Sequence, residues 1–222
     1  MMDLHSPVRD FAVELPLSTR VFHRHHIDFC CGGGVPLEDA CAARGLDPAA
    51  VLAEIEAEAE RASDGTRWDK EPLEALIQHI LVTFHEPLTE ELPRLDALAR
   101  KVARVHGGKG YELAELARLF AGLRVELEQH MEKEEQVLFP LILQGRGAMA
   151  LAPITVMESE HDGAGEILRR LREITHDYAV PEGACTSWRA LWAGLEQLEH
   201  DLHEHIHLEN NVLHPRALGT QA

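Results

Sequence analysis

The chain has 222 residues and a formal net charge of -17, with 38 acidic residues against 21 lysines and arginines. Binding nucleic acid or an anionic membrane surface needs clustered basic residues, so this charge argues against both kinds of partner. Aromatic residues make up only 5% of a composition rich in leucine, alanine and glutamate, which favours helices. The chain does not start with a secretory pattern, and no apolar stretch approaches the roughly 20 residues that span a bilayer. We therefore expect an all-α protein of the cytoplasm.

The distribution of proline and glycine predicts two domains. Residues 1–62 are interrupted by many such breaks and predict a small helical N-terminal domain. Residues 63–66 are typical of a linker. The remainder, residues 67–222, contains four longer stretches with helical periodicity. These cover residues 69–106 (bent near Pro87 and Pro93), 111–143, 153–175 and 187–213. Short turns between long helices make neighbours antiparallel, so we predict an up-and-down four-helix bundle.

The four cysteines are too few for a disulfide framework and are expected to be free thiols. Cys30 and Cys31 precede the glycine run 32–34, which gives the backbone room to approach a ligand or another protein. A buried cysteine followed by an ordinary glycine cap is the alternative interpretation. Because two neighbouring thiolates can accept soft iron or a nitrosyl group, we favour a functional role. Cys41 and Cys185 are predicted to be inert packing residues.

An internal repeat is the most informative feature of the predicted bundle. The segment HMEKEEQVLFP, residues 130–140, aligns without a gap with HIHLENNVLHP, residues 205–215, at an offset of 75 positions. An offset of 76 positions relates His85 to His161. The bundle therefore looks like two copies of one helix pair.

The repeat places metal-binding side chains on the apolar face of each long helix. Residues four apart share a helix face, so His130 with Glu134, and His205 with Glu209, each pair an imidazole with a carboxylate. Both pairs interrupt an apolar stripe, as single histidines do on the first and third helices. Burying such groups without a partner costs several kcal/mol, and a shared cation removes that cost. The predicted ligands are His85, His130, Glu134, His161, His205 and Glu209.

Four imidazoles and two carboxylates suit iron or manganese and differ from the thiolate-rich sites of structural zinc. If Glu134 and Glu209 bridge two ions, about one coordination position stays open for dioxygen or nitric oxide. Glu126, one turn before His130, is predicted to be a proton relay or an exit ligand for iron. Glu160 is a second candidate carboxylate near the metals, although a solvated helix face explains it equally well.

A Glu-x-x-His motif, typical of ferritin-like di-iron sites, occurs at Glu158 to His161 and at Glu204 to His207. Because Glu204 and His207 straddle the polar face of their helix, we rank a ferritin-like site below the histidine-rich one. His203 and His207 are predicted to be surface histidines. The same prediction applies to His5, His79, His176, His200 and His214.

Four segments resemble the RIC family (repair of iron centres), also called YtfE-like or ScdA-like proteins, over nearly the whole chain. They are Phe29-Cys30-Cys31-Gly32-Gly33, VMESEHD (156–162), HMEKEEQVLFP (130–140) and HLENNVLHP (207–215). The resemblance implies a ScdA-type N-terminal domain and a hemerythrin-like bundle. It also implies two non-haem iron ions, bridged by oxo and carboxylate groups and held by the six predicted ligands. Gly34 and the cluster His23, His25 and His26 are departures from the family pattern, and the role of His106 stays open.

The resemblance further implies repair of iron-sulfur clusters damaged by nitrosative or oxidative stress, by donation of iron, with damaged iron-sulfur proteins as partners. Two rivals stay open: a protein that binds nitric oxide or dioxygen reversibly, and a redox enzyme that turns one of them over, such as a nitric oxide reductase. The cysteine pair favours repair. The sequence leaves open the electron donor, the clusters repaired, iron against manganese, and whether the chain forms a homodimer.

Overall fold

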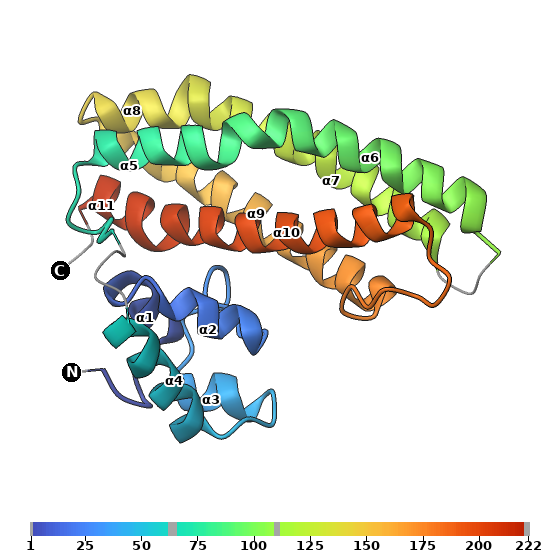
Figure 1. The fold of residues 1–222 in the computed structure, drawn as a ribbon. Coiled ribbons are helices and arrows are strands. Elements are labelled where there is room, and N and C mark those ends of the chain that lie inside the picture. Colours follow the sequence, from blue (N-terminus) through green and yellow to red (C-terminus); the bar gives the residue numbers. More distant parts are fainter. Residues whose placement is uncertain (1, 62–65, 109–111, 220–222) are drawn as a thin grey trace. The chain divides into compact units, whose positions relative to one another are not determined.

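The computed structural model describes residues 2–61, 66–108 and 112–219 (Figure 1). Within these ranges the regular structure is helical, apart from one isolated antiparallel bridge between Pro7 and Pro36, which confirms the predicted all-α class. None of the helices in the described ranges combines the length and the hydropathy needed to cross a bilayer. Linker residues 63–65 and the predicted start of the second long helix at Tyr111 lie outside the described residues.

The chain divides into two compact units, which we call the terminal unit and the central unit. The terminal unit combines Met1–Gln78 with His203–Ala222, and the central unit is His79–Leu202. Two helices cross this division: α5 (Leu73–Ile80) and α10 (Thr186–Leu208).

The terminal unit begins with four helices, of which three are short because proline and glycine interrupt the chain. They are α1 (Val8–Glu14), α2 (Ser18–Arg24), α3 (Leu37–Ala42) and α4 (Pro48–Arg61). Pro7 and Pro36 immediately precede α1 and α3, where a missing backbone N–H costs nothing. These helices share an apolar core that includes Phe11, Phe22 and Phe29. This core holds the loop that carries Cys30 and Cys31.

The central unit is built around long helices that pack as the predicted four-helix bundle. In the described part of the chain these helices are α6 (Glu86–His106), α7 (Leu113–Lys133), α9 (Gly147–Thr175) and α10. Their apolar stripes meet in one core, to which α6 contributes Leu95, α7 Phe120, α9 Leu168 and α10 Trp192. The stripe of α10 continues in this core as far as Leu202.

The third long helix begins at Gly147, six residues before the predicted start at Pro153. That prediction was wrong because it treated Pro153 as a first-turn residue. The preceding segment, Ala-Met-Ala-Leu-Ala, consists of strong helix formers, and their propensity extends the helix across the proline.

Three of the long helical stretches contain a π-helical turn in their described residues. The turns are η1 (Leu81–His85), η2 (Glu134–Leu138) and η3 (Glu209–Leu213). The residue after each turn donates its backbone N–H to the carbonyl five positions back. A proline follows that residue in every case: Pro87, Pro140 and Pro215. Because a proline ring clashes with the carbonyl four positions back, a locally wider turn lets the helix continue. The helix continues as α6 (Glu86–His106) after η1, as α8 (Phe139–Leu143) after η2 and as α11 (His214–Leu218) after η3.

Candidate metal centre

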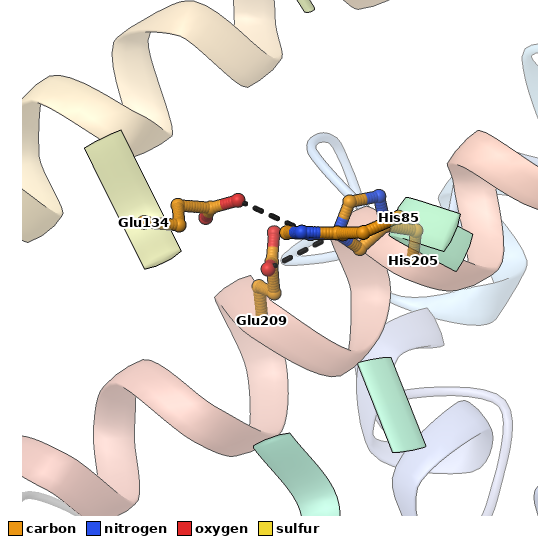
Figure 2. A group of neighbouring side chains, drawn as sticks. All are labelled: His85, Glu134, His205 and Glu209. Carbon is orange, nitrogen blue, oxygen red and sulfur yellow. Dashed lines mark ion pairs between the residues drawn. The ribbon is translucent and has the colours of Figure 1, made fainter. Parts of the chain in front are cut away.

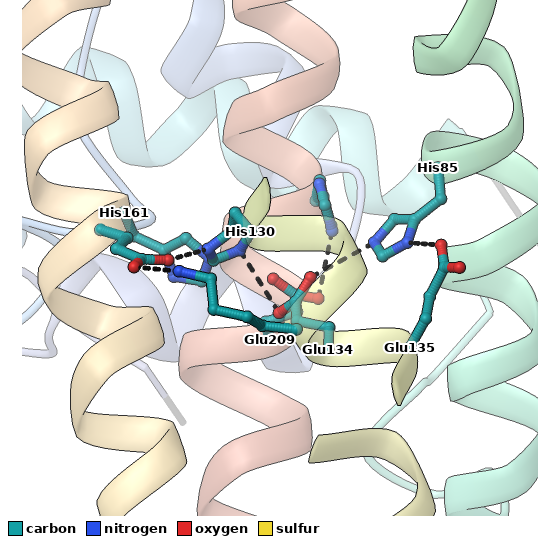
Figure 3. A network of polar contacts seen from close by, with 9 residues as sticks. His85, His130, Glu134, Glu135, His161 and Glu209 are labelled. Atoms are coloured by element: carbon teal, nitrogen blue, oxygen red, sulfur yellow. Dashed lines mark hydrogen bonds and ion pairs between the residues drawn. The ribbon is translucent and has the colours of Figure 1, made fainter. Parts of the chain in front are cut away.

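The central unit brings four of the predicted ligands together in its interior. His85 ends η1, His130 lies in the last turn of α7, Glu134 opens η2, and His161 lies in α9. Their exposed fractions are 2%, 3%, 0% and 2%. Figure 3 shows Glu134 between the imidazoles of His85 and His130. Its carboxylate oxygens lie 3.5 and 3.4 Å from the Nε2 atoms of His85 and His130, respectively. The Nε2 atoms of His130 and His161 are 2.9 Å apart.

These side chains form a buried His/Glu cluster that is able to hold a metal ion. The candidate ligand atoms of His130, Glu134 and His161 all lie within 4.8 Å of one another. A carboxylate with no exposed surface costs several kcal/mol of desolvation unless a cation or strong hydrogen bonds compensate its charge. Imidazole nitrogens and carboxylate oxygens, without thiolate, suit iron or manganese. The residues present therefore fit the metal that the sequence predicted.

Two further carboxylates orient the imidazoles of this cluster. Glu135 Oε1 lies 2.9 Å from His85 Nδ1, and Glu160 Oε2 lies 2.9 Å from His130 Nδ1. Figure 3 shows the contact between Glu135 and His85. A carboxylate at Nδ1 accepts a hydrogen bond from the ring N–H there and leaves the lone pair of Nε2 facing the cluster. Glu135 was not among the residues predicted for the site. In the sequence, its position next to the predicted ligand Glu134 was the feature that could have indicated it.

Glu160 is itself held in place by a neighbouring lysine, Lys133, which forms an ion pair with its other oxygen. Partial burial opposes ionisation of Glu160, but hydrogen bonds from Lys133 and His130 outweigh it and lower the pKa of the carboxyl group. Glu160 therefore stays an anion that accepts a hydrogen bond from His130 Nδ1.

The terminal unit carries the other two predicted ligands, on the helix that continues from α10 into η3. His205 and Glu209 are 2% and 0% exposed. His205 Nε2 lies 3.1 Å from Glu209 Oε1. Figure 2 draws this ion pair as a dashed line. The spacing of four residues thus pairs imidazole and carboxylate as predicted. Like Glu134, Glu209 is the first residue of a π turn.

A cavity of about 140 Å³ lies between α7 and α9 and reaches two residues of the central cluster, His130 and His161. Glu126 and Glu160 line it as well, so the structure places both predicted extra carboxylates on one small space. Gly163 and Ala164 leave room for it on the α9 side. A water molecule takes up about 30 Å³ in the liquid, so the cavity has room for a few small molecules.

Cys30 and Cys31 lie on a tight loop of the terminal unit, with their sulfur atoms 3.8 Å apart. Both backbone N–H groups donate to Asp28 Oδ1 at 3.1 Å. A Cβ on Gly33 would come within 2.5 Å of the Phe29 carbonyl oxygen, so this loop needs glycine there. Contact with the Cys31 thiol and burial raise the pKa of Cys30 well above its ordinary value. Cys31 is half-buried whereas Cys30 is buried, so Cys31 is the more accessible thiol.

The predicted surface positions of His207 and His214 are wrong, because these side chains are only 4% and 1% exposed. The prediction placed them by their angle to the apolar stripe that faces the bundle core and took the opposite face to be exposed. In the terminal unit the opposite face of this helix packs against the N-terminal helices, where the Phe29 ring lies 5.5 Å from that of His207. Burial lowers the pKa of His207 to about 4, so it is neutral at pH 7. His203, half-buried, stacks on His23 with ring centroids 5.5 Å apart.

The other two cysteines differ from each other. Cys41 is fully buried, as predicted. Cys185 is exposed, and its sulfur lies 3.2 Å from His106 Nε2, so the prediction of an inert packing residue is wrong. The His106 ring lies against Trp188, with centroids 4.9 Å apart. The loop before α10 leaves this thiol at the surface, which its apolar character alone did not indicate.

Two family models match the chain. The Hemerythrin HHE cation binding domain matches residues 76–217, and ScdA_N, described as a domain of unknown function, matches residues 4–59.

Curated proteins similar over nearly the full length bear the name iron-sulfur cluster repair protein YtfE. The protein of Edwardsiella ictaluri is 44% identical over 216 residues, which cover 96% of each chain. That of Pectobacterium carotovorum is 45% identical over 209 residues, or 94% of this chain and 95% of the relative. That of Escherichia coli O17:K52:H18 is 43% identical over 213 residues, or 96% of each.

Proposed function

Because this chain belongs to the family of iron-sulfur cluster repair proteins YtfE, we propose that it repairs iron-sulfur clusters damaged by nitrosative or oxidative stress by donating iron. The observation that carries this proposal is the central cluster. A carboxylate with no exposed surface, Glu134, lies between two imidazoles, and each imidazole is oriented by a further carboxylate. Damaged iron-sulfur proteins are the proposed partners.

We propose that the complete centre holds two iron ions, bridged by oxo and carboxylate groups. Leu198 and Leu202 place one stripe of α10 in the bundle core, and His205 and Glu209 continue that stripe three and seven residues after Leu202. The repeat makes Glu134 and Glu209 equivalent, which supports them as the bridging pair. The proposed ligands are His85, His130, Glu134, His161, His205 and Glu209. Bound there, iron supplies both the ion to be donated and a coordination position for a small molecule.

The remaining residues of the site have proposed roles in holding and releasing the ions. Glu135 and Glu160 keep the Nε2 lone pairs of His85 and His130 directed inward. Glu126 and Glu160 share the cavity that reaches the cluster, which supports them as proton relays or exit ligands. Cys31, with Cys30 beside it, offers the accessible thiolate for soft iron.

We propose that residues 1–62 form the thiol-bearing domain and residues 67–222 the metal-binding domain. The family matches to residues 4–59 and 76–217 support this division into two domains. We also propose a cytoplasmic setting, because free thiols at Cys30 and Cys31 need a reducing compartment.

A second candidate function is binding or reduction of nitric oxide or dioxygen. The observation that favours it is the cavity, because its volume suits a diatomic molecule and it reaches His130 and His161. Turnover of nitric oxide far above one equivalent per chain, with unchanged cluster restoration after Cys30→Ser and Cys31→Ser, would make this function the leading one.

Iron content, the absorption spectrum and restoration of damaged aconitase test the proposal together. We expect about two irons per chain and oxo-bridge charge-transfer bands. The double variant His205→Ala, Glu209→Ala should lose the iron, the bands and the repair activity. Glu196→Ala with His200→Ala is the matched control, since these residues are also four apart on α10 and more exposed. Zinc in place of iron, or iron retained without His205 and Glu209, would contradict the proposed centre.

A further inference from the structure

The helix that carries His205 and Glu209 uses its opposite face for a different purpose. His203, His207 and Asn211 follow one another at steps of four residues, so they share a face. At about 100° per residue, His207 points some 160° away from His205 around the helix axis. The segment 203–211 therefore presents the metal-binding pair on one side and a second row of polar side chains on the other.

This second row contacts the backbone of the cysteine loop, which lies in the same terminal unit. The side-chain nitrogen of Asn211 donates to the carbonyl oxygens of Phe29 and Cys30, at 3.3 and 3.2 Å. It also lies 3.0 Å from His207 Nδ1. The backbone of Cys30 is thus bonded at both ends, with Asn211 at its carbonyl and Asp28 at its N–H.

Neighbouring contacts anchor the same helix face to the N-terminal helices. Thr19 Oγ1 donates to Glu204 Oε1 at 3.2 Å, and the rings of His23 and His203 stack. These contacts resist sliding of the helix along the loop. A shift in the turn that contains Asn211 must therefore reach the Cys30 carbonyl.

The repeat provides an internal comparison for this contact. The positions equivalent to His207 and Asn211 are Glu132 and Gln136, both exposed. Gln136 Nε2 donates to Glu132 Oε1 at 3.0 Å, so there the two side chains bond to each other. The ligand-bearing face is common to both copies, whereas the contact with the cysteine loop belongs to the second copy alone among the described residues.

We propose that Asn211 and His207 are positioning residues that couple the Cys30–Cys31 loop to the metal-binding turn of Glu209. Asn211 is the third residue of η3 and Glu209 the first, so a change of ligands at Glu209 alters the turn that holds the Cys30 carbonyl. The reactivity of Cys31 then reports whether metal is bound. This inference rests on the proposed function, because it takes Glu209 as a ligand.

The test measures the rate at which an aromatic disulfide reagent modifies Cys31, in iron-loaded and in chelator-treated protein. A Cys185→Ser background removes the exposed competing thiol. We expect a severalfold difference between the two forms of this parent protein. Asn211→Leu should abolish the difference, and Gln136→Leu, its counterpart in the first copy, should preserve it.

Iron content and circular dichroism separate the ways in which this test can fail. A parent protein that binds no iron would contradict the proposed function itself. The coupling would be overturned by a folded, iron-loaded Asn211→Leu protein that keeps the difference in Cys31 modification rate. It would also be overturned by an iron-loaded parent whose Cys31 modification rate does not change when the iron is removed. If Asn211→Leu does not fold, Asn211→Asp, which keeps the volume but removes the donor, and His207→Leu answer the same question by the same criterion.

Discussion

The two copies of the repeat, residues 130–140 and 205–215, are alike on one helix face and different on the other. Each has a histidine followed four residues later by a fully buried glutamate, which opens a π turn ahead of a proline. We call the opposite face of each helix its outer face. There Glu132 and Gln136 are exposed in the first copy, whereas in the second copy His207 is buried and bonded to Asn211. The face that carries the proposed metal ligands, the inner face, is alike in both copies, whereas the surrounding protein determines the outer face of each copy separately.

The largest effect should come from removing the charge that the two copies share. Glu134→Gln and Glu209→Gln keep the side-chain volume but replace a carboxylate that we propose to bridge the ions by a poor ligand, so each should lose most of the bound iron. Metal analysis of each purified variant beside the parent measures the loss.

Glu132→Gln is the control for this pair, since Glu132 is exposed and lies two residues from Glu134. If Glu134→Gln loses iron while Glu209→Gln retains it, the two copies are not equivalent, and the bridging role of Glu209 fails.

A smaller effect should follow from weakening the hydrogen bonds that orient the imidazoles of the central unit. Glu160→Gln and Glu135→Gln leave every proposed ligand in place but weaken the acceptor at Nδ1 of His130 or His85. Loss of such a partner lowers metal affinity by about 10–100-fold. Competition with a chelator of known affinity measures the change. Equal affinity in all three proteins would mean that these carboxylates do not orient the imidazoles.

The inner face was predictable from the sequence because its constraints are periodic. Six buried polar residues interrupt apolar stripes at helical spacing, and the repeat selects the same positions in both copies. The π turns were not predicted, although Pro87, Pro140 and Pro215 follow them closely, because a proline within a helix is equally compatible with a kink or an end.

The outer face could not be predicted, since periodicity within one helix does not indicate which other segment covers it. His207 and Asn211 are polar residues on a polar face until the cysteine loop is placed against them. Cys185 next to His106 has the same cause, because 79 residues separate the two along the chain. Contacts of this kind depend on the packing of distant segments, and the sequence pattern carries little information about them.

The smallest effect is a change in the stability of the metal-free protein, measured for substitutions at equivalent outer-face positions of the two copies. Asn211→Leu removes the amide donor that reaches the carbonyls of Phe29 and Cys30, and losing a partner of a buried polar group costs about 1–3 kcal/mol. Gln136→Leu changes an exposed side chain, for which about 0.5 kcal/mol is the usual limit. The difference between the two unfolding midpoints, measured with a probe in the terminal unit such as Trp68 fluorescence, isolates the contact with the cysteine loop. Equal midpoints would show that the outer face of the second copy adds no stability, and that its burial reflects packing without a specific bond.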